Sequence, residues 1–351
     1  MKSKLYLKYL ISIIIIFLSY HALMWIFFTS KIFGLDDQTS TGDLSRMSYQ
    51  LDMIQPKKLK YTLNKSFIYD KTFHNQDIDI ITIGDSFSHG VSGGLNPYYQ
   101  DSLATIYNKN ILNVNPIKYD QFIETAIGLH NSGFLKEKKV KYVLIQSVER
   151  FSAIRFSKDI NYTQFNLKDP EISNKISSVQ HQDISIINTA NYKLPYYYMA
   201  YKFKENPKKD VHRLKLTKEL FTNHKDFLVF DGDIKNIPQF TQKNVAIINK
   251  NFNELARVLK KDGIKLIFMP TTDKYDMYYS YIKNNTHPKN PFFDLIRPLH
   301  KEYIFVDVKA ILKPLIDKGK KDIYFVDDTH WSPRGSQAVA NSQVFHKLLS
   351  R

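Results

Sequence analysis

The 351-residue chain contains no cysteine, which excludes disulfide bonds and thiolate chemistry. It also lacks zinc-ligand spacing, a helix-turn-helix pattern and a basic-aromatic repeat, so nucleic acid is not an expected partner. Acidic residues number 34 against 50 lysines and arginines, which gives a formal net charge of +16. The basic residues are scattered along the chain, and such a balance suits an anionic surface, a glycan or a phospholipid headgroup.

The N-terminus carries a long apolar segment. The run from Tyr9 to Phe28 contains no charge and is long enough, as a helix, to cross a bilayer core of about 30 Å. No Ala-x-Ala cleavage site follows it, so we predict an uncleaved anchor over residues 1–30 rather than a signal peptide. Because Lys2, Lys4 and Lys8 precede the run, the N-terminus is expected in the cytoplasm. The rest of this single-pass chain is then expected outside the cytoplasmic (inner) membrane, in a periplasmic or extracellular location.

Beyond the anchor, residues 31–77 are polar and are predicted to form a tether. From residue 78 to 351, strand-like and helical patterns alternate. Strand-like runs lie at 78–83, 111–114, 141–146, 264–269 and 303–308, and helical patterns lie near 98–108, 119–138, 245–261 and 333–349. Strands separated by helices predict an α/β fold with a mostly parallel sheet between two helical layers.

Residues 151–243 interrupt this alternation. They are rich in Asn, Lys, Ser and Tyr and are predicted to form a partly helical insertion at the carboxyl edge of the sheet. The stretch 191–201 is dense in tyrosine. Buried packing is the predicted role of these rings, and a sugar-stacking surface is the alternative.

The first strand ends in residues that can carry chemistry. Gly84-Asp85-Ser86 follows the apolar run at once, which places Ser86 at the carboxyl edge of the sheet, where open α/β sheets bind ligands. A serine hydroxyl becomes a nucleophile when an imidazole takes its proton, and a carboxylate orients that imidazole. His330 is the candidate base, because Asp327 and Asp328 precede it closely. No histidine or carboxylate stands at a ligand spacing from Asp85, so no metal is predicted.

Gly84-Asp85-Ser86 after the first strand, with Asp-x-x-His before the last helix, resembles the SGNH (GDSL) hydrolase superfamily. The resemblance implies an SGNH/flavodoxin-like three-layer α/β/α domain over residues 78–351. The form Asp328-Thr-His330-Trp331-Ser-Pro-x-Gly335 is similar to the membrane-linked polysaccharide O-acetyltransferases of alginate and cellulose acetylation. That branch implies a polysaccharide acceptor, an acyl donor delivered by a membrane-bound O-acyltransferase, and no cofactor.

The same resemblance suggests further site residues and leaves one choice open. Ordinary SGNH spacing points to Asp327 as the third member of the triad, whereas the Asp-x-His-Trp form points to Asp328. The Ser86 backbone N–H is the expected oxyanion donor. Ser147-Val-Glu149-Arg150 stands where the family's asparagine block is usual, so a different second donor is required. The remaining candidates for oxyanion or substrate contacts are Asp85, Glu149, Arg150, Lys274, Tyr275 and Trp331.

These observations predict a membrane-anchored O-acyltransferase, most simply an O-acetyltransferase, that modifies a cell-surface polysaccharide or exopolysaccharide through a Ser-His-Asp acyl-enzyme. An esterase or deacetylase with the same residues is an alternative, because both share the acyl-enzyme. Teichoic-acid D-alanyl transfer is another. A catalytically inactive glycan-binding assembly subunit is the non-enzyme alternative.

Overall fold

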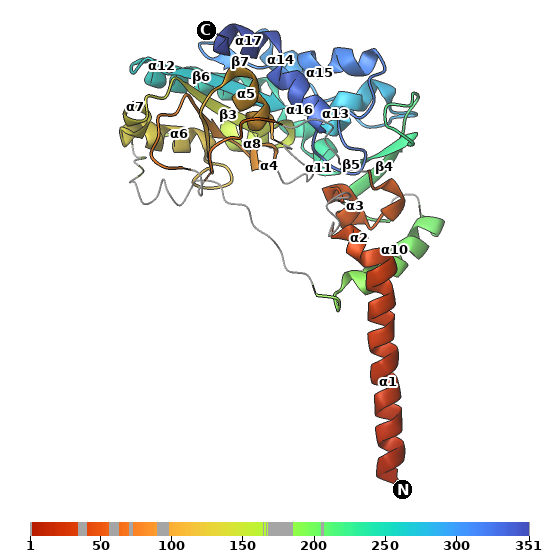
Figure 1. Ribbon diagram of the computed structural model, residues 1–351. Coiled ribbons are helices and arrows are strands. Elements are labelled where there is room, and N and C mark those ends of the chain that lie inside the picture. The colour runs from red at the N-terminus through yellow and green to blue at the C-terminus, as the bar shows by residue number, and fades with distance from the viewer. Residues whose placement is uncertain are drawn as a thin grey trace.

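The computed structural model describes residues 2–33, 41–55, 63–69, 73–89, 98–163, 165, 167, 185–204 and 207–350. Figure 1 shows one long helix that leads from the N-terminus to a rounded body, with the C-terminus at the far end of that body. The long helix consists of α1 (Lys2–Met24), a π-helical turn η1 (Trp25–Thr29) and α2 (Ser30–Ile32). It is long and apolar enough to cross a membrane, and most of its apolar side chains are exposed.

The body is built on five parallel strands in the order β2-β1-β3-β6-β7. Their bounds are Ile80–Ile83 (β1), Ile111–Val114 (β2), Tyr142–Val148 (β3), Lys265–Thr271 (β6) and Ile304–Phe305 (β7). The apolar runs predicted from the sequence form these strands. β1, β2, β3 and β6 are largely buried on both faces, as parallel strands usually are, whereas the short edge strand β7 is partly exposed. The predicted α/β class with a mostly parallel sheet is therefore confirmed.

Helices cover both faces of the sheet because successive side chains of each strand point to opposite sides. Ile81 and Ile83 belong to one apolar cluster, and Ile80 belongs to the other. The first cluster includes α6 (Phe122–Asn131), α7 (Phe134–Glu137), α8 (Glu149–Phe156), α12 (Gln242–Lys260) and α14 (Phe292–Ile296). The second includes α5 (Tyr99–Tyr107), α13 (Lys274–Tyr278), α15 (Val308–Asp317), α16 (Pro333–Ala340) and α17 (Gln343–Leu349).

Two predicted helices are each divided in the structure. The 119–138 pattern gives α6 and α7, because Gly133 adopts a left-handed conformation (φ 81°) that ends regular helix. The C-terminal pattern gives α16 and α17, with a new helix start at Ser342. Both differences concern helix ends, where periodicity carries little information.

The region predicted as an insertion contains both core and peripheral elements. Helix α8, which contains residue 151, packs against β3, β6 and α12. Later come α10 (Ala190–Phe203), the antiparallel hairpin β4 (Val211–Lys215) and β5 (Asp226–Phe230), α11 (Gly232–Lys235) and the 3₁₀ turn η4 (Ile237–Gln239). The hairpin was not predicted. Figure 1 shows α10 beside the outer end of α1, away from the sheet.

The described part of the predicted tether also contains structure. Residues 41–55 hold α3 (Asp43–Ser48) and the 3₁₀ turn η2 (Leu51–Met53), and α3 contacts both strands of the β4–β5 hairpin. Ile68 forms a parallel bridge with Leu112 of β2. Another 3₁₀ turn, η5 (Tyr279–Tyr281), follows α13.

Candidate active site

Ser86 stands at the carboxyl edge of strand β1, which lies between β2 and β3, as its sequence position predicts. The strand ends at Ile83, and Ser86 is the first residue of the short helix α4 (Ser86–His89). Gly84 makes the turn possible, because a Cβ there would lie 2.0 Å from Oγ of Ser88. Gln146 on β3 holds the turn from the other side, since its Oε1 accepts hydrogen bonds from Asp85 N at 3.1 Å and Ser88 Oγ at 2.9 Å.

The structure brings Ser86, His330 and Asp328 together in one hydrogen-bonded chain. Ser86 Oγ lies 2.7 Å from His330 Nε2, and His330 Nδ1 lies 2.6 Å from Asp328 Oδ1. The ionised carboxylate can only accept, so Nδ1 carries the proton and Nε2 is free to accept one from the serine. Both His330 and Asp328 are buried, whereas Ser86 is partly exposed. This is the geometry that a general base and its nucleophile require.

Asp327 points elsewhere, although it is the neighbour of Asp328. Its Oδ2 accepts a hydrogen bond from Gly42 N at 2.8 Å, and its carbonyl oxygen accepts one from Ser45 N at 3.1 Å. A side chain at Gly42 would collide with that carbonyl at 2.0 Å, so the contact requires glycine. Of the two carboxylates that the sequence offers, the structure places Asp328 on the imidazole and Asp327 on the segment before α3.

Asp43, the first residue of α3, adds a second carboxylate to the site. Its Oδ1 accepts from Thr329 N at 2.8 Å, and its Oδ2 accepts from Thr329 Oγ1 at 2.5 Å. Its own N–H donates to Asp328 Oδ2 at 3.1 Å, and its Oδ2 lies 3.8 Å from His330 Nδ1. Burial, and then the Asp328 carboxylate, raise the pKa of Asp43, while His330 lowers it. Sequence reasoning missed this residue, because an acid in a polar segment gives no periodic or motif signal.

Lys274 supports the loop that carries Asp328 and His330. The loop is closed by an antiparallel bridge between Tyr324 and Trp331. The Lys274 ammonium group lies inside it and donates to three carbonyl oxygens, those of Phe325 at 3.1 Å, Val326 at 3.2 Å and Asp328 at 2.6 Å. Burial lowers the pKa of Lys274 to about 8. Lys274 was predicted as a substrate contact, and the structure places it under the loop with no exposed surface.

Two predicted aromatic residues near the site are also buried. Trp331 packs edge-on against Phe87, the residue after the serine, with ring centroids 5.1 Å apart, and Phe87 in turn contacts the His330 ring at 4.5 Å. Trp331 was predicted as an oxyanion or substrate contact, and the structure places it between the His330 loop and α4 as a packing residue. Tyr275 points away, and its hydroxyl donates to the carbonyl oxygen of Pro288 at 3.0 Å.

Asp85 connects the serine turn to β3. Its Oδ2 accepts from Val148 N at 2.7 Å and from Arg155 Nη1 at 2.5 Å. Burial by itself raises the pKa of Asp85, but the charge of Arg155 and the Val148 N–H outweigh it and hold the pKa below its ordinary value. Asp85 is thus an ionised structural carboxylate, and Arg155 is its partner.

Glu149 and Arg150 belong to a buried ionic cluster at the ends of β3 and β6. Arg150 Nη1 donates to Asp273 Oδ1 at 2.7 Å and to Asp233 Oδ1 at 3.0 Å. Glu149 Oε2 accepts from Asp273 N at 2.9 Å. Burial, followed by the charges of Asp276 and Asp273, raises the pKa of Glu149 well above its usual range. These contacts fix the strand ends that support the site. They also engage Nη1 of Arg150, which the sequence suggested as a contact for the oxyanion or the substrate.

Among the described residues, one group of possible metal ligands occurs in the site. The ligand atoms of Asp43, Asp328 and His330 all lie within 4.8 Å of one another. Both ring nitrogens of His330 are already engaged, Nδ1 with Asp328 and Nε2 with Ser86. The arrangement therefore fits a proton relay better than a metal centre.

A serine after the first strand, bonded to an Asp-x-His histidine in a three-layer α/β/α fold, fits the SGNH hydrolase-like class. Residues 228–346 match a protein-family model described as SGNH hydrolase-like domain, acetyltransferase AlgX. The resemblance drawn from the motifs is thereby confirmed, and the chain carries an SGNH hydrolase-like domain. The match supports polysaccharide acetyltransferase function in general. It includes Lys274, Asp328 and His330 and begins after Ser86. No curated protein matches the chain.

Proposed function

We propose that this protein is a membrane-anchored O-acyltransferase that transfers an acyl group, most simply acetyl, to a polysaccharide outside the cytoplasmic membrane. The hydrogen-bonded chain from Ser86 through His330 to Asp328 carries the proposal. The matched acetyltransferase family supports the choice of acyl group and acceptor.

In the first step, His330 Nε2 takes the proton of Ser86 while Ser86 Oγ attacks the carbonyl carbon of the acyl donor. The tetrahedral intermediate then expels the donor's leaving group, which receives the proton from His330, and an acyl-serine remains. In the second step, a sugar hydroxyl gives its proton to His330 and attacks the acyl-serine. Ser86 leaves with the returned proton, and the acyl ester is on the sugar. Asp328 holds the Nδ1 proton and stabilises the imidazolium in both steps.

The oxyanion of each intermediate needs hydrogen-bond donors. We assign the Ser86 N–H, at the start of α4, as one of them. Val148 N is committed to Asp85, and Nη1 of Arg150 is committed to two carboxylates. The second donor therefore differs from the asparagine of ordinary SGNH enzymes.

The anchor supports the location and the partner that we propose. With α1 in the cytoplasmic membrane and Lys4 and Lys8 on the cytoplasmic side, the SGNH-like domain faces outward. Activated acyl groups are made in the cytoplasm, so an outward-facing site needs a carrier. A multi-pass membrane-bound O-acyltransferase that hands the acyl group across the membrane would meet this need. The proposed acceptor is a cell-surface polysaccharide or exopolysaccharide.

The proposal can be tested with the full-length protein, p-nitrophenyl acetate as donor, and oligomannuronate or cello-oligosaccharide as acceptor. We expect acetylated oligosaccharide, detected by mass spectrometry, with the native protein and none with Ser86→Ala. Hydrolysis of the donor with no acetylated sugar would identify an esterase instead. Absence of turnover, together with no labelling of Ser86 by a fluorophosphonate, would favour the inactive glycan-binding subunit.

Asp43 is proposed as a positioning residue, and Asp43→Asn tests this. Its carboxylate accepts two hydrogen bonds from Thr329, the residue before His330, and lies 3.8 Å from His330 Nδ1. We expect kcat to fall about tenfold to a hundredfold, which corresponds to about 1.4 to 2.7 kcal/mol. KM should change little, because Asp43 acts through the position of the His330 loop and not on substrate binding.

The melting temperature separates this role from a purely structural one. Because burial raises the pKa of Asp43, the ionised carboxylate costs free energy in the folded state. Asparagine should therefore leave the melting temperature unchanged or slightly higher. A fall in melting temperature with kcat unchanged would contradict the proposed role.

A further inference from the structure

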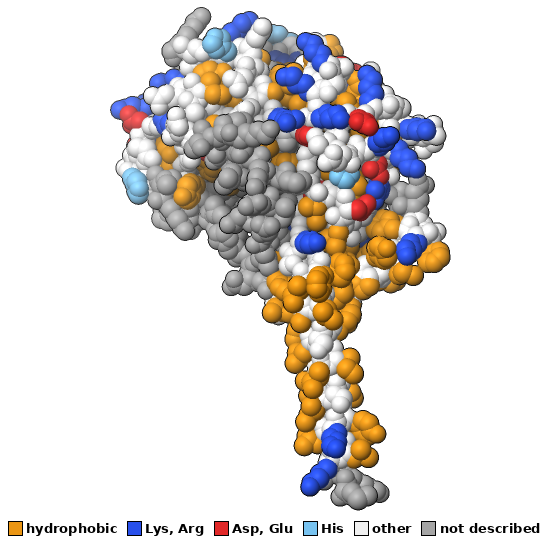
Figure 2. All heavy atoms as spheres, turned by 45° about the vertical axis from the view of Figure 1, so that its right-hand side comes forward, with side chains coloured by type: hydrophobic (Ala, Val, Ile, Leu, Met, Phe, Trp, Pro, Cys, Tyr) orange, Lys and Arg blue, Asp and Glu red, His pale blue; other side chains and the backbone are white. Residues whose placement is uncertain are grey.

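Exposed apolar surface is concentrated on one short segment of the body. Outside the anchor, ten large hydrophobic side chains of the described residues are exposed, and seven of them lie between residues 186 and 203. They are Ile186, Ile187, Tyr192, Tyr196, Tyr198, Met199 and Phe203. Figure 2 shows hydrophobic side chains gathered into a patch where the body meets the anchor helix. The sequence predicted buried packing for these tyrosines, and the structure corrects this for three of them. A patch of this kind is characteristic of a surface that contacts a partner or a membrane.

The first turn of α10 is hydrogen-bonded to the side of α1. The Tyr20 hydroxyl donates to the carbonyl oxygen of Asn191 at 2.6 Å, and the Tyr192 hydroxyl lies 2.7 Å from His21 Nε2. The Asn191 amide lies 2.5 Å from His21 Nδ1, and its Oδ1 accepts from Thr29 Oγ1 at 2.7 Å. The His21 side chain is 1% exposed. Polar groups that are paired in this way can lie at membrane depth, where an unpaired group would be costly.

The position of these contacts along the axis of α1 places the first turn of α10 at the level of the membrane. Seventeen residues separate Lys4 from His21, which corresponds to about 25 Å of α-helix at about 1.5 Å per residue. The hydrocarbon core of a bilayer is about 30 Å thick. With Lys4 at the cytoplasmic boundary or beyond it, as when Lys8 also lies on that side, His21 and the first turn of α10 lie no farther out than the opposite boundary. Tyrosines on α10 then occupy the depth at which aromatic side chains collect in membrane proteins.

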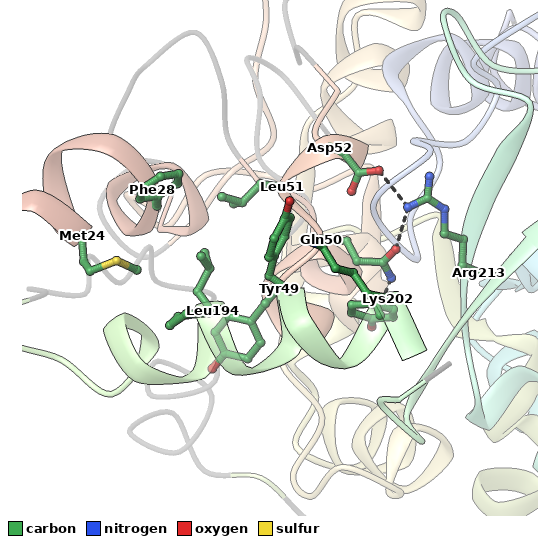
Figure 3. A pocket seen from close by; sticks show the side chains of 12 residues that line it. Met24, Phe28, Tyr49, Gln50, Leu51, Asp52, Leu194, Lys202 and Arg213 are labelled. Carbon is green, nitrogen blue, oxygen red and sulfur yellow. Dashed lines mark hydrogen bonds and ion pairs between the residues drawn. The ribbon is translucent and has the colours of Figure 1, made fainter. Parts of the chain in front are cut away.

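A pocket of about 830 Å³ opens between the outer end of the anchor and α10. Figure 3 shows its apolar end, formed by Met24, Phe28 and Leu194, beside the anchor, and its polar end near Arg213. The Arg213 guanidinium pairs with Asp52 at 2.8 Å. The pocket is thus amphipathic along its length, with its apolar end at the level of the outer leaflet. This is the shape and polarity that a lipid chain with a polar head requires.

We propose that α10 is a second membrane-contacting element, lying in the outer-leaflet interface, and that the pocket holds an acyl chain of a bilayer phospholipid. The proposal rests on the proposed membrane-spanning role of α1. One spanning helix leaves a domain free to rotate and tilt. A second contact at α10 fixes which face of the domain lies against the bilayer. It therefore also fixes the direction in which the active site around Ser86 faces.

The lack of cysteine makes a direct test possible, because one introduced cysteine is a unique labelling site. Full-length Ile187→Cys and Tyr196→Cys variants, labelled with the fluorophore NBD, are placed in phosphatidylcholine–phosphatidylglycerol vesicles that contain doxyl-labelled lipids. We expect the doxyl-labelled lipids to lower the NBD emission at least about twofold and aqueous iodide to lower it little. This is the pattern for a peptide segment that lies in the membrane interface. The control is Gln343→Cys on α17, at the opposite end of the body, which should be quenched by iodide alone.

A label at Ile14→Cys, in the middle of α1, separates the two proposals. If the labels at positions 187 and 196 are quenched by iodide but not by lipid, while the Ile14 label is quenched by lipid, the role of α10 is overturned and the anchor stands. If the Ile14 label is also accessible to iodide, the membrane-spanning role of α1 itself fails.

The pocket is tested by filling it. Leu194→Trp places a larger side chain in the apolar end, and Ile106→Trp, at a 42% exposed position on α5, is the matched control. Native mass spectrometry of protein extracted from the vesicles should show a retained phospholipid on the native and Ile106→Trp proteins. At least a fivefold loss is expected for Leu194→Trp. Equal retention by all three would overturn the pocket assignment.

Discussion

Replacing Ser86 by alanine should lower the rate of acyl transfer by about 10⁶-fold, the cost of removing the nucleophile of a serine triad. The hydroxyl is the acceptor of the acyl group, and in the structure it is the group that meets His330 Nε2 at 2.7 Å. The measurement is the formation of acetylated oligosaccharide from p-nitrophenyl acetate, followed by mass spectrometry. The variant should also lose labelling by a fluorophosphonate.

The variant should fold normally, because Ser86 is partly exposed and loses only a hydroxyl group. An unchanged melting temperature is therefore the control. Ser88→Ala, two residues away, removes a buried hydroxyl that bonds to Gln146 and should cost stability with a much smaller loss of rate. Full acyl transfer by Ser86→Ala would contradict the proposed mechanism.

Asp328→Asn should lower kcat by about 10⁴-fold, as the equivalent change does in the serine-protease triad. The carboxylate accepts from both Nδ1 and the backbone N–H of His330, at 2.6 and 3.0 Å. An amide can present its NH₂ group to Nδ1, which favours the tautomer with the proton on Nε2. The imidazole then cannot take the serine proton. Steady-state kinetics with the artificial donor give the effect.

Asp327→Asn is the matched control, because it makes the same change one residue earlier. Asp327 accepts from Gly42 N, and an asparagine oxygen can accept the same bond. We expect less than a tenfold loss in kcat. A larger loss for Asp327→Asn than for Asp328→Asn would reverse the assignment that the geometry gives.

The sequence was sufficient to predict the sheet and the partners Ser86 and His330. Buried parallel strands are continuous apolar runs, and the turn after Ile83 is marked by glycine, so periodicity and composition locate them. The choice between Asp327 and Asp328 was different. Both side chains lie close to the histidine in sequence, and only the path of the loop around Lys274 determines which one turns toward the ring.

Asp43 could not be predicted as a site residue from the sequence, for a related reason. It meets Thr329 from 286 residues away in the chain, and the segment around it shows no periodicity that would predict a contact. The sequence also does not show whether Arg150 or Arg155 pairs with Asp85. Both arginines lie on α8, and the rotation of that helix on the sheet decides which one faces the serine turn.

The α10 tyrosines show the limit of composition as a guide. A tyrosine-rich stretch has the same composition whether its rings fill a core or lie at an interface. The contacts of α10 with Tyr20 and His21 support the interfacial role that we propose, and those residues lie in another part of the chain.

The contacts of Gly42 and Asp43 with the His330 loop also govern when the site can form and how short the protein can be made. The segment around residue 42 is synthesised early, and the loop at 326–330 that it contacts is among the last parts of the chain. The candidate site is therefore completed only after nearly the whole domain has been synthesised, when its last loop returns to the segment beside the anchor. A soluble version that starts at the first strand would keep Ser86, His330 and Asp328 but lose the segment that holds their loop. A version intended to retain activity should begin before Thr41.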